Sequence, residues 1–249
     1  MNTRYRGSGP RAPDPWDGLL LVDKAAGPTS HDVVDAVRGH FHIPKVGHGG
    51  TLDPGATGLL VLLLGRATKV SQQIMSADKT YEGTMELGVS TDSHDADGAV
   101  LARRDATGVT QEALQAAMKK WTGDVMQVPP MVSAVKKNGV ALYKMARKGQ
   151  EIDREPRPLH IFEFALLAFH PPLARFRVRC TKGTYVRTLC HDVGEVLGCG
   201  AHLRALHRTR SGAFDVKDAV RFEDLFDLTQ MDLLDRIRPL HEVRLQGAM

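Results

Sequence analysis

Residues 47–64 read GHGGTLDPGATGLLVLLL, a glycine-rich loop that runs directly into an apolar stretch. The apolar residues fit a buried strand, which would hold the loop in place. Glycines allow positive φ angles and a close approach to the backbone, and Pro54 stiffens the turn after the single acid, Asp53. Alone, an Asp-Pro-Gly sequence is typical of a simple turn. With glycines on both sides, His48 nearby and further motifs downstream, the loop instead predicts a mounting for a nucleophilic carboxylate.

Outward from this loop, predicted strands and helices follow one another without a regular strand–helix–strand repeat. The residue patterns predict strands at 18–23, 59–64, 79–90, 161–169 and 176–180. They predict helices from Ser30 to about Phe41 and at 67–77, 110–121, 186–197 and 224–237. This order favours an α+β fold with a mixed, largely antiparallel sheet and flanking helices over a doubly wound parallel sheet.

The first seventeen residues differ in composition from the remainder. Residues 1–17 are rich in proline and glycine, carry Arg4, Arg6 and Arg11, and offer little to bury, so they predict a disordered basic arm. Residues 18–249 are long enough and apolar enough for one sizeable domain.

The charge of the chain permits a polyanionic partner without requiring one. The formal net charge is +4 and the isoelectric point is about 9.0. The basic residues gather in the arm, in the segment 136–157 and at Arg204, Arg208 and Arg210, a distribution that favours RNA contacts over a uniformly solvated surface. The middle segment includes Lys136, Lys144, Arg147, Lys148 and Arg154, which we predict to contact RNA phosphates.

The cysteines and the hydropathy pattern point to a reducing compartment. The 3 cysteines form neither a disulfide framework nor a zinc-ligand spacing, so no metal site is predicted. The chain shows no apolar signal region and no membrane-length apolar run, so we expect a cytoplasmic protein.

Six further motifs accompany the Asp53 loop. They are LLLVDKAAG at 19–27, DKTY at 78–81, TDSHDADG at 91–98, SAVK at 133–136, KGTYVRT at 182–188 and LGCGAHL at 197–203. In this order, and together with the loop itself, they resemble the TruB-type tRNA pseudouridine synthases over roughly residues 18–210. The resemblance implies a pseudouridine synthase fold with a central active-site cleft and isomerisation of the uridine at tRNA position 55.

The resemblance also implies roles for individual residues. Asp53 would be the catalytic acid, Arg187 its partner, and Tyr81 a ring stacked on the target base near the proton that leaves C5. Without the resemblance, Tyr81 would be a core tyrosine and Arg187 a surface ion-pair residue.

Other residues would contact a base that has been flipped out of its stack. The resemblance assigns His48 to the space that the base vacates, Leu203 to the uracil pocket and Lys24 to the support of the site. Gly50 and Thr51 of the loop complete the predicted substrate contacts.

Pseudouridine formation needs no redox or phosphoryl step, so no cofactor is expected. The reaction breaks the N1–C1′ bond and joins C5 to the same carbon, which requires carboxylate chemistry at a sugar carbon. Asp53 either adds to C1′ or removes a sugar proton, and the sequence leaves both open. Desolvation would raise the pKa of Asp53, and a planar Arg187 fork bound to it in two places would oppose that rise.

The motif at 95–98 also invites a calcium interpretation. Ser93 replaces the first ligand of a calcium loop, and Arg104 stands where its glutamate belongs, so that interpretation fails. By resemblance, this acidic loop shapes the cleft or contacts flipped-out nucleotides.

The expected partner is the T-arm stem-loop of tRNA, bound by a monomer without an obligatory protein partner. The chain ends at Met249, where relatives commonly continue into a PUA-type RNA-binding domain, so we expect that domain to be absent. The alternatives are an RNA-guided relative within a box H/ACA particle and a noncatalytic tRNA chaperone. The basic segment 136–157 favours a stand-alone enzyme, and the set Asp53, Tyr81 and Arg187 argues against a purely binding role.

Overall fold

The computed structural model of the chain describes residues 14–131, 136–137, 140–141 and 154–240. The strands are β1 Gly18–Lys24, β2 Val46–His48, β3 Thr57–Leu64, β4 Lys79–Leu87, β5 Val89–Thr91, β6 Val100–Arg103, β7 Gly123–Gln127, β8 Lys136–Lys137, β9 Val140–Ala141, β10 Arg157–His170, β11 Leu173–Cys180, β12 Ala201–Ser211, β13 Phe214–Asp215, β14 Val220–Arg221 and β15 Arg238–Pro239. The α-helices are α1 Ser30–His40, α2 Ser71–Ser76, α3 Gln111–Lys119, α5 Val186–Leu197 and α6 Gln230–Arg236, with 3-10 turns η1 Gly65–Val70, η2 Val216–Asp218 and η3 Glu223–Asp227.

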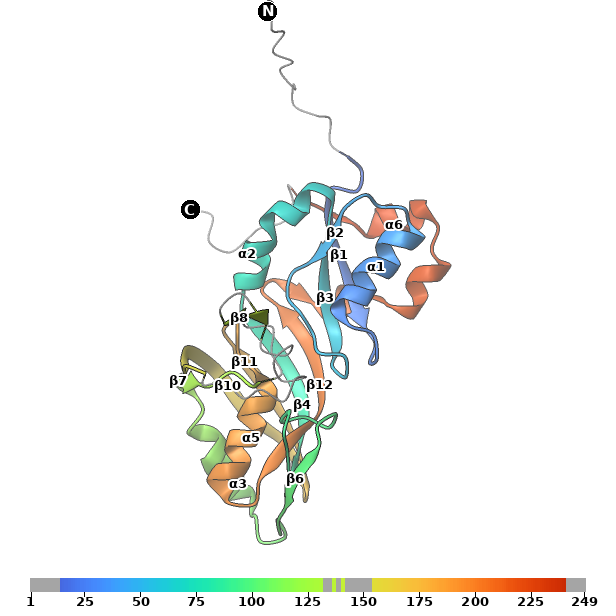
Figure 1. Ribbon diagram of the computed structural model, residues 1–249. Helices are drawn as coiled ribbons and strands as arrows, with labels where there is room; N and C mark the ends of the chain where they lie inside the picture. Colours follow the sequence, from blue (N-terminus) through green and yellow to red (C-terminus); the bar gives the residue numbers. More distant parts are fainter. Residues whose placement is uncertain (1–13, 132–135, 138–139, 142–153, 241–249) are drawn as a thin grey trace, which may run out of the picture.

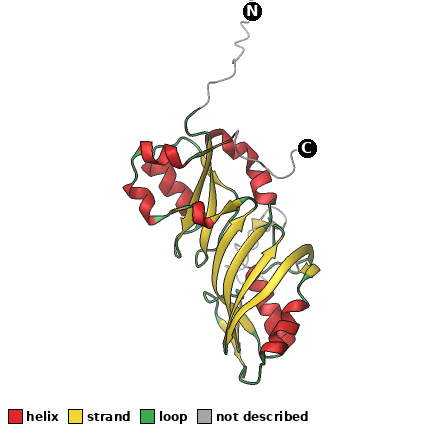
Figure 2. Cartoon of the chain, turned by 180° about the vertical axis from the view of Figure 1, so that it is seen from behind, coloured by secondary structure: helices red, strands yellow, loops and turns green. Residues whose placement is uncertain are grey.

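One curved sheet runs through the whole molecule (Figures 1 and 2). Its main path has the order β14-β1-β3-β12-β4-β11-β10-β7, and β2, β13 and β15 pair at its sides. Within the described residues, β1 with β14 and β3 with β12 are the parallel pairs, and the other ladders are antiparallel. The predicted α+β class with a mixed, largely antiparallel sheet is confirmed.

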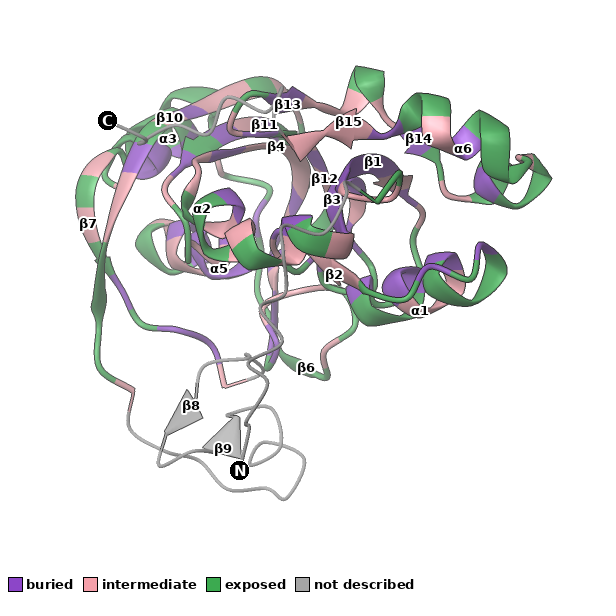
Figure 3. Cartoon of the chain, turned by 90° about the horizontal axis from the view of Figure 1, so that it is seen from above, coloured by how far each residue is buried: buried purple, intermediate pink, exposed green. Residues whose placement is uncertain are grey.

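The first part of the sheet is buried on both faces, which explains why β1 and β3 read as unbroken apolar runs (Figure 3). On one face, Leu20 and Leu62 pack against α1 and the turns before α6. On the other face, Leu21 and Val61 pack against η1 and α2. Both layers together are called the β1–β3 core.

The second part of the sheet is covered by helices on one face. Met85 of β4, Phe176 of β11 and Leu203 of β12 are buried against α3 and α5, which lie side by side (Figure 1). This layer is called the β4–β12 core. Figure 2 shows the opposite face of these strands free of described helices.

The two parts meet where β3 pairs with β12. Gly58 lies opposite Arg208 in a parallel register. Gly58 has a φ of 98°, and a Cβ atom there would lie 2.4 Å from the Arg208 carbonyl oxygen. The seam between the two parts therefore requires glycine at this position.

Several helix boundaries follow the capping chemistry that the sequence carries. Thr29 caps α1 in a capping box with Asp32, and Gly198 ends α5 in the left-handed conformation, so both helices lie where the sequence predicted them. The single α-helix predicted at 67–77 is instead the 3-10 turn η1 followed by the short α-helix α2. The prediction is therefore wrong for residues 67–70. The single helix expected at 224–237 is η3 followed by α6, because Leu228 is extended and Thr229 starts a new capping box.

The structure corrects one further expectation and contains one strand that was not predicted. Trp16 packs on the β1–β3 core and Asp17 accepts hydrogen bonds from the backbone and side chain of Arg66, so the predicted disordered arm does not extend through residues 14–17. The long strand β12 was not predicted, because its polar residues and its two register shifts interrupt the alternation.

A Gly58→Ala variant should be strongly destabilised. The added methyl group meets backbone atoms and the residue acquires a strained φ, which together should reduce the free energy of unfolding by about 2–5 kcal/mol. Gly123→Ala is the matched control, because Gly123 has a φ of 91° with no atom within 4 Å of the added Cβ. Denaturant unfolding of both variants measures the difference, and equal losses would show that the contact with Arg208 is unimportant.

Candidate active site

The Asp53 loop connects β2 to β3 and is held from below by a buried lysine. Lys24 has no exposed surface, and its Nζ donates to the carbonyl oxygens of Ala25 at 2.7 Å, Pro54 at 3.1 Å and Ala56 at 2.8 Å. Burial lowers the pKa of Lys24 to about 8, and the Asp53 carboxylate opposes this shift. The predicted supporting role of Lys24 therefore takes the form of direct bonds to the loop backbone.

A buried arginine, Arg208, bonds both to the start of the same loop and to the strand that follows it. Arg208 is 2% exposed and donates from Nε to the Leu59 carbonyl at 2.7 Å. Its two terminal nitrogens donate to the carbonyls of Thr51 at 3.2 Å and Gly50 at 3.1 Å. The sequence placed Arg208 in a basic surface cluster for RNA, and its burial shows that this assignment is wrong. Gly50 and Thr51 are anchored through their carbonyl groups.

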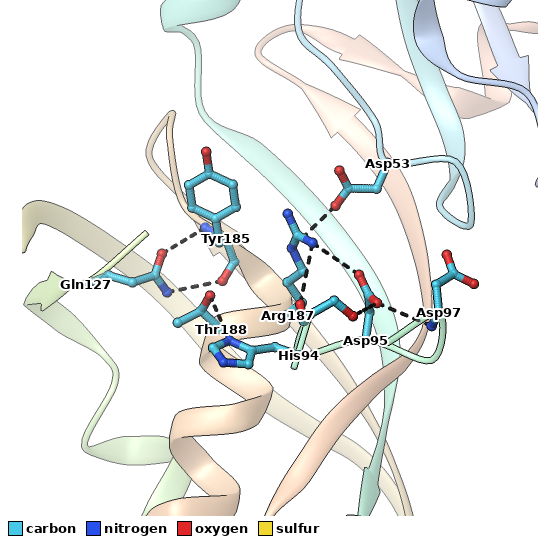
Figure 4. Close-up of polar contacts among 9 residues, drawn as sticks. Asp53, His94, Asp95, Asp97, Gln127, Tyr185, Arg187 and Thr188 are labelled. Atoms are coloured by element: carbon cyan, nitrogen blue, oxygen red, sulfur yellow. Dashed lines mark hydrogen bonds and ion pairs between the residues drawn. The ribbon is translucent and has the colours of Figure 1, made fainter. Parts of the chain in front are cut away.

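Arg187 lies in the first turn of α5 and bridges two carboxylates (Figure 4). The guanidinium is 4% exposed, with Nε 3.6 Å from Asp53 Oδ2 and Nη1 3.2 Å from Asp95 Oδ2. The predicted partnership with Asp53 is present, but the predicted two-point fork on Asp53 alone is not. The fork is divided between Asp53 and a second acid.

Asp95 belongs to the acidic turn, defined here as residues 92–98. Ser93 donates from its hydroxyl to Asp95 Oδ1, and the Asp97 backbone N–H donates to the same oxygen at 3.3 Å. Arg187 also donates to the Ser93 carbonyl at 3.4 Å. The sequence assigned this turn to cleft shape or nucleotide contact, and no feature of the spacing indicated that one of its acids would share Arg187.

Burial raises the pKa of the Asp53 carboxyl, and the Arg187 guanidinium opposes this rise. The negative charges of Asp95 and Asp97 reinforce it, and Lys24 opposes it weakly. The side chain nevertheless keeps 52% of its surface exposed. Asp53 is thus a carboxylate that protein surrounds on one side and that remains accessible on the other.

Tyr81 lies on β4 directly opposite Arg208 and is partly buried against the β4–β12 core. Burial raises the pKa of its phenol, the Arg208 guanidinium opposes the shift, and the Asp53 carboxylate adds to it. Tyr81 therefore interacts electrostatically with Asp53, which pairs in turn with Arg187, and the catalytic roles of the three residues stay predictions.

The other residues predicted to contact the substrate, His48 and Leu203, differ in how far they are buried. His48 is half-buried and its Nδ1 accepts from the Gly50 N–H at 3.3 Å, and burial lowers its pKa. Leu203 is 7% exposed within the β4–β12 core, and its place in a uracil pocket stays a prediction. Leu206 lies opposite Gly83, is half-buried and is on the face that carries Tyr81.

A pair of hydrogen bonds that the sequence did not reveal fixes the start of α5. Gln127 donates from its amide to the Tyr185 carbonyl at 3.1 Å and accepts from the Tyr185 N–H at 2.9 Å (Figure 4). The Tyr185 ring centroid lies 5.7 Å from the Arg187 guanidinium carbon. These contacts restrict the backbone from which Arg187 projects.

The predicted RNA-contacting segment is only partly visible. Lys144, Arg147 and Lys148 lie outside the described residues, and of Lys136 only the backbone strand is described. Arg154 is half-buried and donates to the Pro129 carbonyl at 3.1 Å.

Among the described residues, no group of three or more His, Cys, Asp or Glu is placed to hold a metal ion. None of the helices in this part of the chain has the length and apolarity to cross a membrane.

Two substitutions should move the pKa of Asp53 in opposite directions. Asp95→Asn removes a negative neighbour and leaves Arg187 to Asp53, so the pKa should fall, whereas Arg187→Gln removes the opposing cation and the pKa should rise. Carbon-13 NMR titration of the Asp53 carboxyl, assigned with Asp53→Asn, measures both shifts. Arg38→Gln, which breaks the exposed 2.8 Å pair with Asp35, is the control. Shifts of the same sign would contradict the shared-arginine geometry.

Comparison with known proteins places this geometry in a family. The model described as the TruB family pseudouridylate synthase N-terminal domain matches residues 38–186, and the tRNA pseudouridylate synthase B C-terminal domain model matches residues 187–243. tRNA pseudouridine synthase B of Opitutus terrae is 50% identical over 226 residues, covering 91% of this chain and 94% of the relative. The enzyme of that name from Syntrophotalea carbinolica is 50% identical over 207 residues, covering 83% of this chain and 68% of the relative.

A solved structure agrees with the sequence relatives. A chain of a Cbf5-Nop10-Gar1 complex superposes with a TM-score of 0.73 at 30% identity over 92% of this chain, which spans 61% of that chain's length. The matched family models, the identities and the shared fold all lead to one assignment. The chain belongs to the TruB family of pseudouridylate synthases.

Proposed function

We propose that this protein isomerises the uridine at position 55 in the T-loop of tRNA to pseudouridine, with Asp53 at the reacting centre. The observation that carries the proposal is the half-exposed Asp53 carboxylate, 3.6 Å from the buried Arg187 on a loop fixed by Lys24 and Arg208. The relatives at 50% identity, each named tRNA pseudouridine synthase B, support tRNA as the substrate.

Asp53 must be ionised for either route at the sugar, addition to C1′ or removal of a sugar proton. Arg187 favours the ionised form and orients the carboxylate. The 3.6 Å separation is longer than a tight charge-assisted hydrogen bond, so the carboxylate is not committed to the arginine. When Asp53 loses its charge by bonding to carbon or taking a proton, Arg187 still has the Asp95 carboxylate at 3.2 Å. The buried Arg187 guanidinium therefore keeps an anionic partner throughout the reaction.

Tyr81 is proposed to stack on the target base. Because its phenol pKa is raised, the hydroxyl remains protonated at neutral pH in the free enzyme and serves first as a hydrogen-bond donor. Stacking between an aromatic side chain and a base contributes about 1–3 kcal/mol, which helps to offset the few kcal/mol needed to extrude the uridine. His48 and Leu206, beside the same loop and strand, are proposed to contact the flipped nucleotide or the space it leaves.

The enzyme is proposed to act on the T-arm stem-loop as a cytoplasmic monomer without a protein partner. The identity to relatives named for tRNA is 50%, against 30% to a chain from a complex that contains Nop10 and Gar1, and this difference favours the stand-alone enzyme over a guided particle.

Asp53→Asn should abolish product formation while the protein remains folded. Pure protein is mixed with an unmodified tRNA transcript labelled with tritium at uridine C5, and tritium release is counted. A transcript with cytidine at position 55 is the substrate control. Wild-type release with the variant at background is expected, and turnover above a few per cent of wild type would exclude the proposed role of Asp53.

Asp53→Asn should also change the stability of the folded protein. Because the folded-state pKa of Asp53 is raised, its ionisation destabilises the folded state at pH values above that pKa. Asp53→Asn should therefore have an equal or higher Tm than wild type at pH 7, and the gap should narrow as the pH falls. A lower Tm at pH 7 would mean that Asp53 supports the fold.

Tyr81→Phe retains the ring and removes the hydroxyl, whereas Tyr81→Leu removes both. If the hydroxyl takes part in chemistry, Tyr81→Phe should bind tRNA normally and lose most single-turnover activity, while Tyr81→Leu should also lose affinity. Filter binding and single-turnover kinetics separate the two effects. Wild-type rates in Tyr81→Phe would reduce Tyr81 to a stacking platform.

A further inference from the structure

The acidic turn touches α5 at a second place, independent of the Arg187–Asp95 pair. The imidazole ring of His94 lies flat on that of His191, with ring centroids 3.9 Å apart and an interplanar angle of 2°. His94 Nδ1 is also 3.4 Å from Thr188 Oγ1 (Figure 4). Arg187, Thr188 and His191 occupy the first two turns of α5, so one stretch of helix receives both contacts.

The backbone of His94 is fixed in an uncommon conformation. Its φ is 65°, in the left-handed region that a residue with a side chain seldom adopts. Its N–H donates to the Thr91 carbonyl at 3.3 Å, and its carbonyl accepts from the Leu203 N–H of β12 at 2.9 Å. The next residue is Asp95, so the direction in which the His94 backbone leaves this position sets where the Asp95 carboxylate lies.

We infer that the stacked imidazoles of His94 and His191 are positioning residues that lock the acidic turn onto α5 and thereby hold Asp95 against Arg187. The inference rests on the proposed function of Asp53 only for its kinetic readout. Neither histidine touches Asp53, and both act through Asp95. Two rings packed face to face in this way favour the neutral state, because two imidazolium cations at this distance would repel each other.

The surroundings keep the stack neutral at physiological pH. Burial, together with the charges of His191, Arg187 and Arg154, lowers the pKa of His94 to about 3. Burial also lowers the pKa of His191, where Glu195 opposes the shift and Arg104 adds to it. The remaining acid on this part of α5 is Asp192, whose pKa burial raises to about 6.

Variants on either side of the stack test the inference. His191→Ala removes one ring and leaves the turn unchanged, and His94→Asn removes the other with a residue that tolerates a positive φ. Each should lower the single-turnover rate at saturating tRNA by about tenfold, as expected for a displaced charge partner, with the Kd for tRNA changed less than about twofold. His191→Phe keeps a stacking ring and should retain a rate within about threefold of wild type. His170→Ala, at an exposed histidine on β10, is the matched control and should behave as wild type.

A double-mutant cycle separates positioning from general stability. In an Asp95→Asn background the carboxylate to be positioned is gone, so adding His191→Ala should produce no further loss of rate. Loss that persists in that background would overturn the inference, as would a wild-type rate in His191→Ala or an equal loss in His191→Phe.

A readout without catalysis distinguishes this inference from the proposed function. In His191→Ala the Asp53 carboxyl, followed by carbon-13 NMR, should shift its pKa in the same direction as in Asp95→Asn. An unchanged Asp53 pKa would overturn the inference even if the variant is slow. If the wild-type protein forms no pseudouridine, the proposed function fails while this shift still decides the positioning role.

Discussion

The parallel pairing of β3 with β12 places the backbone of Arg208 against Gly58 and turns the Arg208 guanidinium under the Asp53 loop. Through its three nitrogens this side chain bonds carbonyl oxygens at both ends of the loop. Lys24 of β1 bonds two carbonyl oxygens in the second half of the loop, those of Pro54 and Ala56. Two cations are thus buried against carbonyl oxygens, and the loop they hold keeps the Asp53 side chain on its outer surface.

Charge balance around Asp53 follows from this arrangement. Lys24 and Arg208 bind the backbone of the loop, and the acidic turn brings Asp95 and Asp97 near the Asp53 carboxylate. Arg187 stands between the two sets and pairs with an acid from each. Burial and the neighbouring acids raise the pKa of Asp53, and Arg187 opposes them more strongly than Lys24 does. The reactivity of Asp53 is therefore a balance among groups from β1, the loop, the acidic turn and α5.

The parts of this site that could be predicted are those that local sequence determines. Glycines around Asp53 next to an apolar run indicate a loop on a buried strand, and the stripe ending at Gly198 indicates a helix that begins near Arg187. The family motifs then connect these segments. Local patterns carry no information on which long side chains turn inward, so the burial of Arg208 was missed.

Contacts between distant segments account for the other differences. Leu203 and Leu206 would point to opposite faces of a regular strand, but the register shift between Leu203 and Ala205 brings both to the face of Met85 and Gly83. The division of Arg187 between two acids depends on where the acidic turn docks, as does the His94–His191 stack. Such docking is set by tertiary packing, which hydrophobic periodicity does not encode.

The proposed active site lies at the seam between two hydrophobic cores, and this has a consequence for how the chain folds. Asp53 stands on the β1–β3 core, whereas Tyr81 and Arg187 stand on the β4–β12 core, far away in the sequence. Closing contacts of such long sequence separation is a slow part of folding. The chain's 2 tryptophans divide between the cores, Trp16 packing on the first and Trp121 on the second. Each core therefore carries its own intrinsic fluorophore, while recovered catalysis reports only the moment at which the two join.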